Sequence, residues 1–279
     1  MLRADLNHAH NVRFQGVDLL RGLAITMMVA YHFCYDLAWF RFVPWTRSDM
    51  LTDSGWIGWR SLIVTSFLTI VGVSLALSIV FKPSWFDFGK RWAQIASAAM
   101  LVSIASYGFV GERWIYFGIL HFIAVTTLLC RLMLFRMKTV RWIATLGFGA
   151  IVMGFLFPTS AFDLPPLNIL GFAARKPPTD DFVPLFPWIG VVLIGIAGGR
   201  LWQAHGFRPV AALSVLNAAV PAPLQKVLAG MGRWSLTIYL VHQPILIGVL
   251  AVVSAASCTV PSLLGQPRAV LLYQTCFTL

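Results

Sequence analysis

The chain has 279 residues, of which 58% are hydrophobic and only 11% are charged, and its mean hydropathy is +0.79. Because soluble domains average about 25% charged residues, this composition excludes an ordinary soluble domain. The apolar runs are long and continuous rather than alternating, which predicts an all-α, polytopic membrane helical bundle rather than a barrel. The net charge of +11 is explained by basic residues that set membrane topology. We therefore expect contact with the lipid bilayer and no nucleic-acid partner.

Seven apolar segments follow one another along the chain, each long enough to cross a bilayer. A polar lead-in over residues 1–16 precedes a single transmembrane domain over residues 17–256. The predicted spans are 17–40, 60–81, 92–110, 114–134, 142–158, 185–203 and 233–256. The connection over 204–231 is basic and contains prolines, and it leaves a further weak span open. An apolar tail of unclear structure, 257–279, is interrupted by prolines and makes a poor span.

The basic residues between the spans predict their orientation. Fourteen of the 21 Lys and Arg residues fall on the side of the N-terminus, and the other seven fall on the opposite side. Short loops rich in Lys and Arg stay on the cytoplasmic side of a membrane. The N-terminus is therefore predicted to be cytoplasmic.

The first predicted span carries ionisable residues at membrane depth. At about 100° per residue, Asp18, Arg21, His32 and Asp36 share one face of the helix. Ionisable groups at this depth cost about 2.5–3.5 kcal/mol each, so the face must point into a protein interior or a wet cavity. Arg21 and His32 are eleven residues apart, which is roughly 16 Å along the helix axis. They are too far apart to hold one atom but well placed to contact two ends of a long ligand.

The i, i+4 spacing of His32 and Asp36 favours an acid–base pair. The carboxylate would hold one imidazole nitrogen and raise the basicity of the other. A buried polar pair that only locks helices together is the alternative. For His121 and His242, a functional role and a structural role are both compatible with the sequence. Counted from the span ends, His32 and His121 fall in the outer half of the membrane and His242 falls near its middle.

Arg21 lies near the predicted cytoplasmic edge and has two interpretations. It is either a snorkelling interfacial arginine or an anchor for a phosphate-bearing ligand. Its position on the His32 face, after Asp18, favours the anchor, and Gly22 would allow a close backbone approach. The chain has no Gly-rich nucleotide loop and no G-x-S-x-G sequence. Its four cysteines lack metal-site spacing, and no metal is expected.

Four stretches of the chain, in order, resemble one family of membrane proteins. They are VDLLRGLAITMMVAYHFCYDL at 17–37, IYFGILHFIAV at 115–125, DFVPLFPWIGVVLIGIAGGRL at 181–201 and GRWSLTIYLVHQP at 232–244. They are similar to a bacterial family that carries the heparan-α-glucosaminide N-acetyltransferase catalytic-type domain, within the transmembrane acyltransferase superfamily. The resemblance covers most of residues 12–250.

The resemblance implies a multi-pass acyltransferase of the bacterial inner membrane. It would move an acetyl group from cytoplasmic acetyl-CoA to an amino sugar or other glycan-type acceptor on the outer side. The broader superfamily has an Arg followed eleven residues later by a His, which Arg21 and His32 match. Asp180 and Asp181 would then meet a cationic amino sugar. The roles predicted are catalysis for His32, Asp36 and His121, acetyl-CoA binding for Arg21, Asp18 and Gly22, and acceptor binding for His242 and Asp181.

A transporter or permease is the alternative function. Its buried polar stripe would form a path for a substrate or for protons. The sequence shows no internal repeat and no paired broken helices, which disfavours this alternative. A scaffold subunit, in which the buried charges are structural, is a third possibility. Binding of acetyl-CoA would separate the acyltransferase from both.

Overall fold

The computed structural model describes residues 2–80, 84–134, 139–207, 214 and 218–264 and confirms the all-α prediction. Five helices are long and apolar enough to cross a membrane, and two shorter apolar helices accompany them. The long helices are α1 (Leu2–Trp39), α3 (Ser54–Val80), α4 (Trp85–Val110), α7 (Leu185–Ala204) and α10 (Ser235–Leu264). The shorter ones are α5 (Ile119–Leu134) and α6 (Val140–Leu156).

Each predicted span overlaps one of these seven helices, but the ends differ. The fourth predicted span starts at residue 114, whereas α5 begins only at Ile119, because residues 114–118 are irregular. At the start of the chain, α1 begins at Leu2, so the lead-in is helical and continuous with the first span. Of the predicted tail, 257–264 continue α10 and 265–279 lie outside the described residues.

Short helices and turns join the long ones. They are α2 (Arg47–Thr52), the 3₁₀ turns η1 (Gly111–Arg113), η2 (Ser160–Phe162) and η3 (Leu167–Leu170), and α9 (Ala222–Arg233). The connection that leads into α10 thus contains a helix of 12 residues. This length is too short to cross a bilayer, since about 20 residues are needed.

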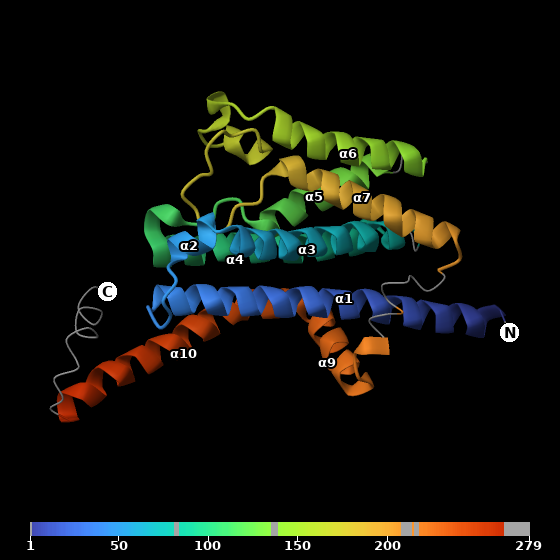
Figure 1. The fold of residues 1–279 in the computed structure, drawn as a ribbon. Helices are drawn as coiled ribbons and strands as arrows, with labels where there is room; N and C mark the ends of the chain where they lie inside the picture. Colours follow the sequence, from blue (N-terminus) through green and yellow to red (C-terminus); the bar gives the residue numbers. More distant parts are fainter. Residues whose placement is uncertain (1, 81–83, 135–138, 208–213, 215–217, 265–279) are drawn as a thin grey trace.

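The helices stack in layers (Figure 1). Helix α6 covers α7, α7 packs on α3, and α3 packs on α1. Helix α10 runs beside the later part of α1, and α9 packs against the opposite side of α1 from α3 (Figure 1). Helix α4 pairs with α5. The upper layers, α3 to α7, therefore face a lower layer made of α1, α9 and α10.

The crossing of α1 and α9 brings the two backbones together. A Cβ at Gly22 would overlap the carbonyl oxygen of Leu228, and a Cβ at Gly232 would overlap that of Asp18. Small residues at such crossings allow helices to approach closely in membranes. Because α10 follows α9 after one residue, this contact fixes where α10 begins relative to α1.

Candidate functional site

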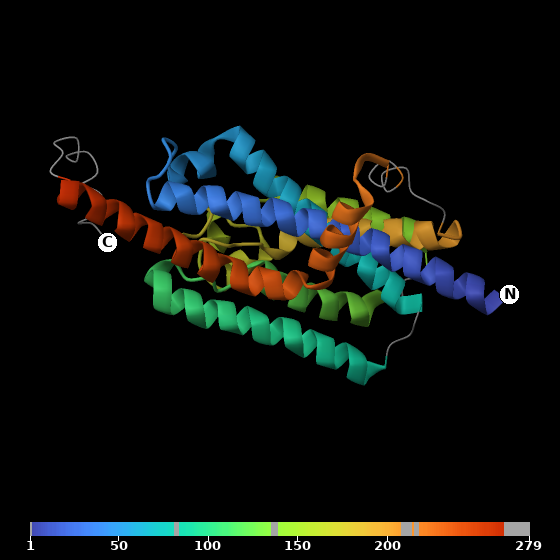
Figure 2. The same cartoon turned by 90° about the horizontal axis from the view of Figure 1, so that it is seen from below.

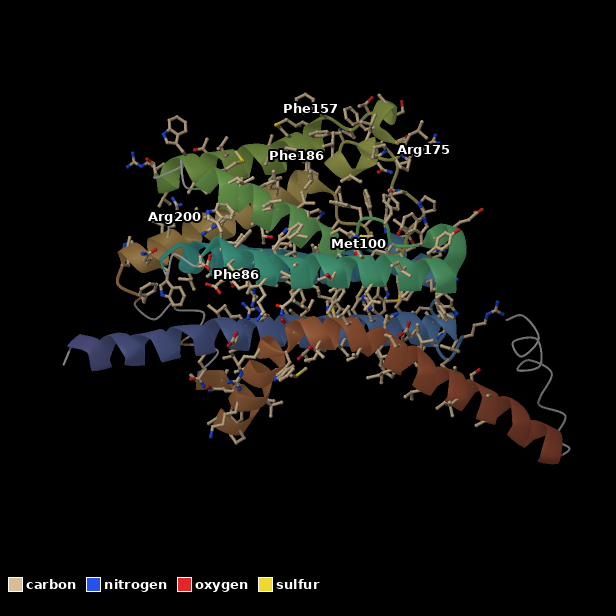
Figure 3. The ribbon with its side chains drawn as sticks, turned by 180° about the vertical axis from the view of Figure 1, so that it is seen from behind. Phe86, Met100, Phe157, Arg175, Phe186 and Arg200 are labelled. Carbon is tan, nitrogen blue, oxygen red and sulfur yellow. The ribbon has the colours of Figure 1, made fainter. Side chains whose placement is uncertain are left out.

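A cavity of about 1670 Å³ lies between the two layers. Along α1 its lining extends from Arg21 to Trp39, eighteen residues or about 27 Å of helix. That length approaches the roughly 30 Å thickness of a hydrocarbon core. Drug-sized ligands occupy pockets of about 300–1,000 Å³, so this cavity has room for a long ligand or for two. Figure 3 shows side chains filling the space between α4 and the α1–α10 layer.

His32 of α1 and His242 of α10 contact each other in the cavity wall. His242 Nε2 lies 3.0 Å from His32 Nδ1, and the ring centroids are 4.9 Å apart. His242 Nδ1 lies 2.8 Å from the Tyr239 carbonyl oxygen and 3.1 Å from that of Ile238. The sequence did not predict the contact between the two rings, because it placed the two histidines at different depths in the membrane.

These contacts determine which nitrogen of each neutral ring carries hydrogen. Carbonyl oxygens only accept, so His242 Nδ1 must donate and His242 Nε2 must accept. His32 Nδ1 is then the donor of the hydrogen bond between the rings. The remaining nitrogen, His32 Nε2, then carries the lone pair, with the Gln243 side chain as its neighbour. The pair therefore presents one base of defined position, as a general base or a nucleophile requires.

Asp36 approaches this pair through a neighbour on α10. It is only 1% exposed, and its Oδ1 accepts a hydrogen bond of 3.1 Å from Gln243 Nε2. The side chain of Gln243 also lies beside His32. Among the hydrogen bonds of the described residues, none joins Asp36 directly to His32. The predicted acid–base pair is thus an indirect one, in which Gln243 stands between the carboxylate and the imidazole.

One end of the cavity, which we call the Arg21 end, is lined by Arg21, Arg91 and Arg233, with Asp87 as its acidic member. The Arg21 guanidinium donates to Asp18 Oδ1 at 2.8 Å and to Ser74 Oγ at 3.0 Å. Asp18 and Ser74 thereby hold Arg21 from α1 and α3. Gly22, which was predicted to approach a ligand, packs on α9 instead and is not part of the cavity wall.

The opposite end, which we call the loop end, includes the segment that leads into α7. Asp180 pairs with Arg113 and accepts from the Tyr35 hydroxyl at 3.4 Å. Lys176 lies within electrostatic range of Arg60, Arg113 and both loop aspartates. Figure 3 shows Arg175, in the same segment, at the end of the molecule opposite to Arg200 of α7.

Asp181 ties three elements together at the loop end. It accepts from the Ile119 N–H at the start of α5 at 3.0 Å, and from the Tyr239 hydroxyl of α10 at 3.3 Å. A Cβ at Gly118 would overlap this carboxylate, so a glycine there lets Asp181 approach the start of α5. Burial raises the pKa of the Asp181 carboxyl, while the hydrogen bonds from Ile119 and Tyr239 act in the opposite direction. Asp181 therefore holds the wall of the cavity as well as lining it.

His121 is placed away from the His32–His242 pair. Its Nδ1 accepts from the Gly118 N–H at 3.3 Å, and its Nε2 lies 3.0 Å from Ser103 Oγ. Ser103 Oγ in turn donates to the Ile115 carbonyl oxygen at 2.7 Å. This chain fastens the irregular segment before α5 to α4, and His121 is not among the cavity-lining residues. Its placement favours a structural role.

Several cavity residues were not found from the sequence. Gln243 and Tyr239 flank His242 in the stretch YLVHQP, and the helical period of α10 was the signal that could have identified them. Arg60 and Lys176 carried no such signal, because only the folded chain brings them together. Within the described ranges, no group of three His, Cys, Asp or Glu side chains is placed to hold a metal ion.

The family model described as "Heparan-alpha-glucosaminide N-acetyltransferase, catalytic" matches residues 13–244. These residues include both histidines of the pair and every charged residue named above at the two ends of the cavity. No curated protein and no solved structure matches the chain.

Proposed function

This chain belongs to the family of the heparan-alpha-glucosaminide N-acetyltransferase catalytic domain, and on that basis we propose that it transfers an acetyl group across a bacterial inner membrane. The acetyl donor is cytoplasmic acetyl-CoA, and the acceptor is an amino sugar or another glycan on the outer side. The observation that carries the proposal is His32 Nε2, a base of defined tautomer in the wall of a cavity with cations at both ends.

The topology that we propose has seven crossings and a cytoplasmic N-terminus. The shorter helices α5 and α6 complete the count begun by the five long ones. The charge bias of the connections places the Arg21 end on the cytoplasmic side. The loop end then faces outward, which would let the acetyl donor and the acceptor enter from opposite sides.

The Arg21 end suits the phosphates of coenzyme A. Three guanidinium groups, those of Arg21, Arg91 and Arg233, line it. Guanidinium groups bind phosphate oxygens through paired, charge-assisted hydrogen bonds. The pantetheine arm would extend along α1 towards His32, about 16 Å of helix away. The thioester would then lie beside the histidine pair.

The transfer step uses His32 Nε2 as a base. It takes a proton from the acceptor N–H or O–H as the acceptor atom bonds to the thioester carbon. The carbon–sulfur bond breaks, and the proton passes from His32 to the departing sulfur. In a second route, His32 Nε2 first takes the acetyl group itself and the acceptor then removes it. Both routes need the lone pair of His32 Nε2, which stays unprotonated while His32 Nδ1–H donates to His242.

The first experiment compares the wild type with His32→Ala and Arg21→Ala in purified, detergent-solubilised protein. Acetyl-CoA binding and acetyl-CoA hydrolysis are measured separately. We expect His32→Ala to bind acetyl-CoA without turnover, and Arg21→Ala to bind it weakly. His205→Ala is the matched control, since His205 is an exposed histidine at the end of α7. Absence of binding by folded wild-type protein would contradict the proposal.

A transporter remains the competing function, because the cavity extends over most of the length of the long helices. A transporter would move its substrate without consuming acetyl-CoA. Flux into vesicles that is unchanged by His32→Ala and independent of acetyl-CoA would favour it.

A further inference from the structure

Helices α4 and α10 separate along the loop-end half of the cavity. Nearer the start of α10, Leu236 and Leu240 pack with Ala98 and Ala99 of α4. Further along, α10 turns away from the body, and both Figure 1 and Figure 2 show it diverging from α4. Within the described chain, no residue of α10 beyond Leu240 joins a hydrophobic cluster with α4.

The cavity reaches the gap between these diverging helices. Ala105 and Phe109 of α4 and Ile247 and Gly248 of α10 still line it there, and the cavity is not enclosed. The walls of the gap are apolar or small. Their outward neighbours are also apolar, since Ile104 is 67% exposed and Val252 is 71% exposed. In a membrane this gap faces hydrocarbon, so an alkyl chain can occupy it without desolvating any polar group.

The charged residues that line the loop end of the cavity favour an anion. Both loop carboxylates are already engaged, Asp180 by Arg113 and Asp181 by Ile119 and Tyr239. Arg60 and Lys176 both line the cavity within electrostatic range of each other, and neither forms an ion pair with a carboxylate within the described part of the chain. The wall of the loop end thus carries more cations than carboxylates, which suits a phosphate-type group. A cationic amino sugar alone would meet repulsion at this end.

We propose that the acceptor is a lipid-anchored glycan with a phosphate-type anion between sugar and lipid. The anion binds at Arg60 and Lys176, the alkyl chain leaves through the gap between α4 and α10, and the sugar reaches towards His32. This inference rests on the acetyltransferase function proposed above and specifies its acceptor. The cations of the loop end complement the anion, and the apolar gap suits the alkyl chain. A soluble glycan has no alkyl chain to place in this gap.

The test uses three acceptor probes that differ in one feature each. They are glucosamine linked through a phosphate to a dodecyl chain, glucosamine 1-phosphate without a chain, and dodecyl glucosaminide without a phosphate. We expect kcat/KM for the complete probe to exceed both others by about tenfold or more, because tail and anion each contribute. Equal kcat/KM for the complete probe and glucosamine 1-phosphate would overturn the inference.

A pair of glycine variants isolates the gap. Gly248 lines the cavity, and a Cβ added there meets no atom within 4 Å, so the side chain of Gly248→Trp should start unobstructed and extend into the gap. It should raise KM for the dodecyl probes about tenfold and leave acetyl-CoA binding and glucosamine 1-phosphate unchanged. Gly108→Trp on α4 is the matched control, since Gly108 is equally uncrowded but lies outside the cavity lining. An effect of Gly248→Trp on oligomeric state, with KM unchanged, would assign the gap to a subunit contact and overturn the inference.

Charge variants isolate the anion site. Arg60→Gln and Lys176→Gln should weaken both phosphate probes by about tenfold and leave dodecyl glucosaminide unaffected. Direct binding of dodecyl phosphate, followed by native mass spectrometry, is a readout that does not depend on transfer. Lack of binding, with acetyl-CoA still bound and hydrolysed, would overturn the lipid acceptor and leave the acetyltransferase intact. If the protein bound dodecyl phosphate but not acetyl-CoA, the acetyltransferase function would be overturned and the lipid-phosphate site would remain.

Discussion

Both ends of the cavity are lined by cations, but they hold their charges differently. At the Arg21 end, Arg21 is anchored by Asp18 and by Ser74, and all its neighbouring arginines stand on helices or at a helix end. At the loop end, Lys176 comes from an irregular connection, and within the described residues neither Lys176 nor Arg60 forms an ion pair. Under the proposed function, the difference fits a fixed site for an invariable ligand at one end and a site completed by its ligand at the other.

The largest effect should come from the residue between the two ends. His32→Ala removes the base, and general base catalysis contributes about 10²–10⁴-fold to rate. We expect transfer to fall by that factor while binding at both ends persists, as measured by single-turnover kinetics and by acetyl-CoA titration. Activity within tenfold of wild type would remove His32 from the reaction.

Arg21→Ala tests the fixed end. Loss of charge-assisted hydrogen bonds should raise KM for acetyl-CoA by about 10–100-fold and leave KM for the acceptor unchanged. Arg21→Lys should recover part of the loss, because the charge returns without the paired geometry. Arg141→Ala on the exposed face of α6 is the control. If both KM values rose together, the two ends would not be separate sites.

Variants of His242 distinguish a role in positioning His32 from a role in packing alone. His242→Leu removes the acceptor for His32 Nδ1–H, and kcat should fall about tenfold with an altered pH profile. His242→Gln keeps an oxygen that can accept this hydrogen bond and should restore most of the rate. A purely structural role would make both variants lose thermal stability while the shape of the pH profile stays as in the wild type.

The smallest effect on catalysis should come from Asp181→Asn at the loop end. The hydrogen bonds to Ile119 and Tyr239 would weaken, which costs about 1–3 kcal/mol of unfolding free energy. We expect a lower melting temperature and a modest rise in acceptor KM. Gly118→Ala should lower the melting temperature in the same way, because its Cβ would displace the Asp181 carboxylate. Gly149→Ala on α6 is the control, because its Cβ meets no atom within 4 Å. A large loss of kcat without a change in melting temperature would contradict this supporting role.

The sequence predicted the helices and the polar face of α1, because hydropathy and the 3.6-residue period are local properties. It therefore identified Arg21, His32 and Asp36. It did not predict the contact between His242 and His32, because this contact depends on the crossing of α1 and α9 at Gly22. The register between two helices cannot be read from the sequence of either helix alone. It predicted Asp181 as a ligand for an amino sugar but not the contacts of Asp181 with Ile119 and Tyr239, because these residues lie 62 and 58 positions away in the chain.

The division between the two layers has a consequence for how such proteins diversify. The histidine pair stands entirely on α1 and α10, and α9 locks the start of α10 to α1. Arg60, Arg113 and Lys176 belong to the facing layer and its connections. Under the proposed function, substitutions at these three loop-end residues can therefore change the acceptor while the histidine pair stays intact. Related chains should keep the histidine pair and the arginines of the Arg21 end and vary at the loop end, so that one inherited reaction serves many acceptors.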